Sequence, residues 1–91
     1  MNKKEIIEIL YKQLELLDEK MKTETDNRTL SDMLCDFRHI GLTVLSKNPT
    51  EEQKDGIFKM ASAQMKLLSE KKSVYFSDCL ADLANFMFRI F

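Results

Sequence analysis

The sequence predicts an all-α protein that folds as an antiparallel up-and-down four-helix bundle. The 91 residues include only two glycines and one proline, which favours long helices with short connections. Four segments repeat apolar residues at the three- and four-residue intervals of a helix face, and polar stretches separate them. A chain of this length forms one domain, so residues 1–91 are expected to share a single core.

The first two helices are predicted over residues 3–22 and 29–46. The apolar seam of the first is widened by further apolar residues, so this helix is expected to contact two neighbours. That seam contains Ile7, Leu10, Leu14, Leu17 and Met21, and the residues that widen it are Ile6, Ile9 and Leu16. Either Asn27 or Thr29 is expected to cap the second helix. Gly41 lies near the seam of that helix, where it either permits close approach of a neighbour or costs about 1 kcal/mol of helix propensity.

The last two helices are predicted over residues 51–70 and 77–90. Pro49 ends the preceding helix, and residues 50–53, Thr-Glu-Glu-Gln, match the capping box that begins a new one. Two lysines and Ser73 indicate a turn before the fourth helix.

The fourth helix is unusually apolar at its end, where the sequence reads ANFMFRIF. Such a helix either lies centrally and is covered by the others, or exposes a patch that binds a partner protein or a second copy. Insertion into a membrane surface is a third alternative, but the polar side of the helix lacks the enrichment in Lys and Arg that such helices need. The residues predicted to contact a partner are Phe86, Phe88, Phe91 and Arg89.

A second predicted contact surface lies on the second helix and consists of Asp32, Cys35, His39 and Leu42. Cys35 and His39 are four residues apart, the spacing of paired metal ligands on one helix face. A metal or nucleophile site needs further ligands or an oxyanion donor, and no CxxC, second histidine or glycine-rich loop is present. We therefore predict no metal, no cofactor and no catalytic residues.

Charge and motifs favour protein binding over other functions. The net charge is −1 and does not segregate along the chain, so the charge does not favour nucleic acid as a partner. The alternative function is a DNA-associated transcriptional regulator, with a helix–loop–helix over residues 37–59. Its exposed N-terminal turns would carry Glu51, Glu52 and Asp55, which repel phosphates. The P-loop, GxSxG and HExxH motifs of enzymes are absent.

Two cysteines and the apolar pattern indicate the cellular location. Cys35 and Cys79 are expected to be reduced thiols, because no disulfide framework accompanies them. Glu5 and Glu8 interrupt what would be the apolar part of a signal peptide. No segment is long and apolar enough to span a bilayer, so a cytoplasmic location is expected.

The opening EILYKQL, the helix lengths and the KSVYFS before the last helix resemble small cytoplasmic bacteriocin immunity proteins. The resemblance implies an antiparallel four-helix bundle that guards a membrane receptor. Small inhibitors encoded by phages and other mobile elements are equally compatible with the sequence. The sequence therefore predicts a non-enzymatic protein that binds another protein as an inhibitor, immunity factor or regulatory subunit, with a homodimer through the last helix as a further expectation.

Overall fold

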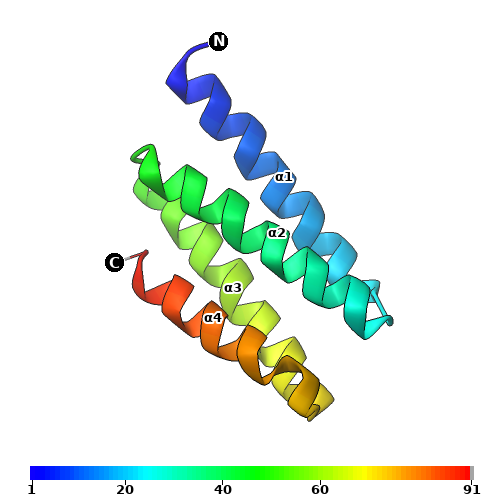
Figure 1. Ribbon diagram of the computed structural model, residues 1–91. Helices are drawn as coiled ribbons and strands as arrows, with labels where there is room; N and C mark the ends of the chain where they lie inside the picture. Colours follow the sequence, from blue (N-terminus) through cyan, green and yellow to red (C-terminus); the bar gives the residue numbers. More distant parts are fainter. Residues whose placement is uncertain (91) are drawn as a thin grey trace.

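The computed structural model describes residues 1–90, which form four α-helices joined by short connections (Figure 1). The helices are α1 Lys3–Thr23, α2 Asn27–Ser46, α3 Glu51–Lys71 and α4 Ser77–Phe88, and the 3-10 turn η1, Val74–Phe76, directly precedes α4. The predicted all-α four-helix fold is confirmed, and each predicted helix boundary lies within two residues of the observed one. Phe91 lies outside the described residues.

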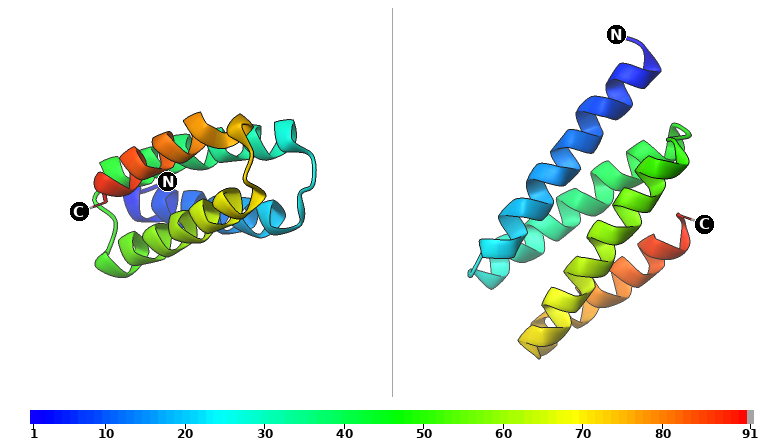
Figure 2. Two further views of the ribbon diagram at one scale, coloured as in Figure 1. Left: turned by 90° about the horizontal axis from the view of Figure 1, so that it is seen from below. Right: turned by 180° about the vertical axis from the view of Figure 1, so that it is seen from behind.

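Each helix runs antiparallel to the one before it in the chain (Figure 1). α1 packs mainly against α2 and α3, and α4 packs mainly against the same two helices. α1 and α4 therefore occupy opposite corners of the bundle, with α2 and α4 in one layer and α1 and α3 in the other (Figure 2). No helix lies at the centre of such an arrangement, so of the alternatives for the last helix, a central position covered by the other three does not apply.

Capping side chains fix where α2 and α3 begin. Thr50 Oγ1 accepts a hydrogen bond from the Gln53 backbone N–H at 3.1 Å, and Gln53 Oε1 accepts one from the Thr50 N–H at 2.9 Å. This confirms the predicted capping box. α2 is instead capped by Asp26, whose carboxylate accepts from the Thr29 N–H at 2.9 Å and from its hydroxyl at 2.7 Å. Neither Asn27 nor Thr29 is the capping residue, because both already lie within the first turn.

The last turn of the chain is tighter than predicted. α4 ends at Phe88, and Arg89 and Ile90 donate to the carbonyls of Phe86 and Met87, three residues back, at 3.0 and 3.2 Å. Such bonds are typical of a helix end that tightens into a 3-10 turn. This turn still directs Ile90 into the core, where it is 6% exposed.

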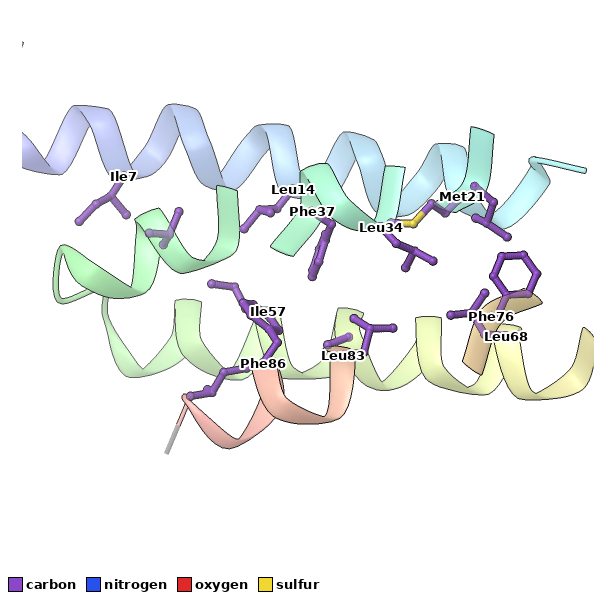
Figure 3. Close-up of a cluster of buried hydrophobic side chains, with 14 residues drawn as sticks. Ile7, Leu14, Met21, Leu34, Phe37, Ile57, Leu68, Phe76, Leu83 and Phe86 are labelled. Atoms are coloured by element: carbon purple, nitrogen blue, oxygen red, sulfur yellow. The ribbon is translucent and has the colours of Figure 1, made fainter. Parts of the chain in front are cut away.

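All four helices and η1 contribute to one hydrophobic core, with Phe37 and Phe76 among the largest of its buried side chains (Figure 3). The fully buried members include Leu14, Met21, Leu34, Phe37, Val44, Ile57, Leu68, Phe76 and Leu83. Neighbouring members within a segment are three, seven or eleven residues apart, which are spacings of residues on one side of a helix. The core therefore runs along the whole bundle and holds α4 at both ends.

Gly41 is buried where α2 meets α4. A Cβ atom at this position would lie 2.6 Å from Phe86 Cζ, a closer approach than carbon atoms tolerate. The Phe86 ring is 3% exposed and packs edge-on against Phe37 with ring centroids 5.9 Å apart. Of the two predicted roles for Gly41, the structure thus supports the close approach of a neighbouring helix.

Candidate protein-binding surface

Two of the predicted contact phenylalanines point in opposite directions. Phe86 and Phe88 are two residues apart on one helix, which turns the second side chain by about 200° from the first. Phe86 is 3% exposed and belongs to the core, whereas Phe88 is 80% exposed. The structure therefore corrects the prediction for Phe86 and leaves Phe88 and the exposed Arg89 as candidates. The third predicted phenylalanine, Phe91, lies outside the described residues.

An apolar groove of about 370 Å³ lies between α3 and α4 beside Phe88. It is lined by Phe58 and Met65 of α3 and by Ala84, Met87 and Phe88 of α4. Phe58 and Met65 are seven residues apart, so they lie on the same side of α3 two turns from each other. The groove therefore joins an exposed aromatic ring to a recess whose lining residues are all apolar.

The opposite side of α4 is held to α2 by polar contacts. Arg38 of α2 lies 3.4 Å from the Asp82 carboxylate, and the Ser31 hydroxyl lies 3.6 Å from Cys79 Sγ. α4 is thus attached through its polar side to α2 and through Phe86 to the core, while its α3 side contributes the apolar groove. We call the groove together with the exposed side of α4 the α3–α4 face, defined by the groove residues with Asp78, Ala81, Asn85 and Arg89.

The second predicted surface does not form a single patch. Asp32 and His39 are exposed on α2, but Cys35 is half-buried and accepts from the Arg38 guanidinium at 3.5 Å. Leu42 is half-buried and packs against the core rather than projecting outward. The prediction for Leu42 is corrected, because α4 covers the side of α2 that the sequence left open. Within residues 1–90 no group of three or more His, Cys, Asp or Glu side chains is placed to hold a metal ion.

Two apolar side chains of α1, Ile9 and Leu16, were predicted from their spacing to belong to the core, but they are exposed. Ile9 is 46% exposed and Leu16 is 60% exposed, although both were expected to widen the buried seam. Leu16 borders a groove of about 330 Å³ that also includes His39 and Ile40 of α2. Ile9 and Leu16 are seven residues apart, and this interval was the available signal for a separate stripe.

Two polar side chains, Gln64 and Tyr11, lie partly or fully within the bundle. Gln64 is 2% exposed and donates from Nε2 to the Asp18 carboxylate at 3.1 Å, while Oε1 of Gln64 has no hydrogen-bond partner within residues 1–90. The pKa of Tyr11 is raised, first by burial of the phenol and then by the nearby carboxylates of Glu15 and Glu52. The Tyr11 hydroxyl adjoins Gly56 of α3, whereas Gln64 lies eight residues further along that helix, so the two groups do not form one site.

Comparison with known proteins neither adds to nor contradicts this description. Searches against protein-family models, curated proteins and solved structures gave no match for this chain. Among the helices of residues 1–90, none combines the length and apolar character needed to cross a membrane.

Proposed function

We propose that this protein is not an enzyme and acts by binding another protein through the α3–α4 face. The observation that carries the proposal is the 80% exposure of Phe88 beside an apolar groove. Burying a phenylalanine side chain in a complex contributes about 1.5–3 kcal/mol, so leaving it in water withholds a large part of that energy from folding. Aromatic side chains that project next to an apolar recess are typical anchors of protein–protein interfaces.

The biological role that fits is an inhibitor, an immunity factor or a small regulatory subunit, including those encoded by phages and mobile elements. Each of these roles needs a stable scaffold that presents one contact surface, and none needs a reaction centre. The two cysteines are free, which is compatible with the reducing cytoplasm.

DNA binding has less support than protein binding. Glu51 and Glu52 form the exposed first turn of α3, the position where a recognition helix would meet phosphates. Their negative charges would repel the DNA backbone there. A mobility-shift assay at low salt is expected to show no complex with duplex DNA.

Affinity capture from the native host tests the proposal, with Phe88→Asp as the interface variant and Leu16→Asp as the matched control. Both residues are exposed apolar side chains, and they lie on helices at opposite corners of the bundle. Both variants are expected to keep the helical circular dichroism of the wild type. The captured protein should be lost with Phe88→Asp and retained with Leu16→Asp. If the folded Phe88→Asp variant captures the same protein as the wild type, the α3–α4 face is not the binding site.

A further inference from the structure

We infer that the partner of the α3–α4 face is a second copy of this chain, and that the protein forms a two-fold symmetric dimer in which each Phe88 packs into the apolar groove of the other copy. This inference rests on the proposed function, because it names an occupant for the same face. In a two-fold dimer one patch serves both copies, so the patch needs a projection and a recess that match each other. Phe88 projects from the surface and also forms one side of the groove, which places both features together.

The exposed side of α4 has the residue spacing of a contact between helices. Asp78, Ala81, Asn85 and Phe88 are all exposed, and they follow one another at intervals of three, four and three residues. These intervals are typical of a seam between helices that pack at a shallow angle. Ala81 and, one turn later, Ala84 place small side chains in the middle of this seam, so a second helix can approach closely.

The charges at the two ends of α4 favour an antiparallel pair. Asp78 lies in the first turn of α4 and Arg89 directly follows the last turn, and both side chains are exposed. Within residues 1–90 neither of them forms an ion pair. An antiparallel pair brings each Arg89 toward the partner's Asp78, whereas a parallel pair places like charges side by side.

One register satisfies both the apolar and the charged contacts. With the two-fold axis between Ala84 and Asn85, Phe88 lies opposite the partner's Ala81, about one helical turn before Ala84 of the groove. Arg89 then lies opposite a position about 3 Å along the helix from the partner's Asp78, since each residue advances the axis by about 1.5 Å. The arginine side chain is long enough to span that offset.

The dimer is expected to be weak. α4 has 12 residues and is about 18 Å long, so the interface falls at the small end of specific protein contacts. Dissociation at low protein concentration would free the same face for a different protein. Self-association would therefore control access to the proposed binding surface.

Sedimentation equilibrium over a concentration series tests the dimer. The wild type is expected to follow a monomer–dimer equilibrium, Leu16→Asp to match it, and Phe88→Asp to remain monomeric. Asp78→Arg and Arg89→Glu should each weaken dimerisation by about tenfold, because each replaces two attractive contacts with repulsive ones. Circular dichroism and urea unfolding of every variant establish that the fold is retained.

A mixture of the two charge variants provides the decisive measurement. An Asp78→Arg chain and an Arg89→Glu chain carry opposite charges at the facing positions, so their mixture should form a heterodimer although each alone is mostly monomeric. The roughly tenfold weakening by each single variant is what identifies the antiparallel pair, because in a parallel pair each variant would only replace one pair of like charges by another. A wild type that stays monomeric at all concentrations, or a mixture that does not associate, overturns the inference. If capture of another protein still depends on Phe88 in that case, the proposed function stands. A dimer that follows the charge swaps without any Phe88-dependent capture supports the inference and overturns the proposed function.

Discussion

Gly41 is the position at which α4 docks on α2, and replacing it with alanine tests how firmly Phe86 is held there. In a helix interior this substitution usually stabilises by about 1 kcal/mol, because alanine has the higher helix propensity. Here the added Cβ would lie 2.6 Å from Cζ and 2.9 Å from Cε1 of the Phe86 ring. Overpacking of this kind costs about 1–3 kcal/mol when the neighbouring side chain cannot move away.

The Phe86 ring has little room to yield. It is 3% exposed and lies edge-on against Phe37, which is itself fully buried. We therefore expect Gly41→Ala to lower the free energy of unfolding by about 1 kcal/mol, the overpacking cost less the gain in propensity. Urea unfolding followed by circular dichroism measures this difference from the midpoint and the slope.

Two further variants distinguish this packing effect from a general loss of stability when a helix glycine is replaced by alanine. In a Phe86→Leu background the obstructing ring edge is removed, so Gly41→Ala should become stabilising, and the double-mutant cycle should show the coupling between the two sites. At Gly56 of α3 the added Cβ would meet the hydroxyl end of Tyr11, which is half-buried and can swing toward solvent. Gly56→Ala is therefore expected to be less destabilising than Gly41→Ala. If Gly41→Ala stabilises the wild type as it would an exposed helix, Phe86 is not seated against α2 as described.

Two other predictions follow from the helix caps and from the environment of Tyr11. Thr50→Ala should lower the free energy of unfolding by about 1 kcal/mol because the Gln53 N–H loses its side-chain acceptor. Thr25→Ala is the control, since its hydroxyl makes no hydrogen bond within residues 1–90, and equal stability of the two variants would contradict the capping role. In a Tyr75→Phe background, ultraviolet titration should give a Tyr11 pKa above the ordinary value of 10.0, because burial and neighbouring carboxylates favour the neutral phenol. The contribution of the buried neutral phenol to the free energy of unfolding is therefore fully present below pH 10.0 and is lost as the pH rises through the folded-state pKa. A free energy of unfolding that does not change over this range would contradict the assignment.

The helices could be predicted from the sequence because several local signals agree at each of them. Around Pro49 the helix stop, the Thr50 cap and the acidic first turn all indicate the same boundary, and the observed α3 begins there. The residue that caps α2 could not be predicted in this way, because Asp26 as well as the expected Asn27 and Thr29 can cap a helix. Which of them does so depends on backbone geometry, and Asp26 alone has the extended conformation that aims its carboxylate at the Thr29 N–H.

The placement of side chains between neighbouring helices could not be predicted from periodicity alone. A period of three to four residues identifies an apolar side of a helix but does not say how wide the part covered by neighbours is. Leu16 was assigned to the core on this basis and is 60% exposed, whereas Leu42 was assigned to the surface and is half-buried. Both assignments depend on which helices adjoin α1 and α2, and that information lies in contacts between distant parts of the chain. The burial of Gln64 depends in the same way on Asp18 from another helix.

The exposure of Phe88 follows from the fold class together with the composition of α4. In a bundle of four helices each helix occupies a corner and keeps one side toward solvent. A helix that is apolar nearly all round cannot bury every side chain at a corner, so some apolar residue on it has to be exposed. Phe86 takes the inward position because Gly41 leaves space for its ring, and Phe88, turned by about 200° from it, is thereby directed outward. The glycine on α2 and the surface phenylalanine on α4 are thus parts of one arrangement, in which the site that docks α4 also sets the direction of the proposed anchor.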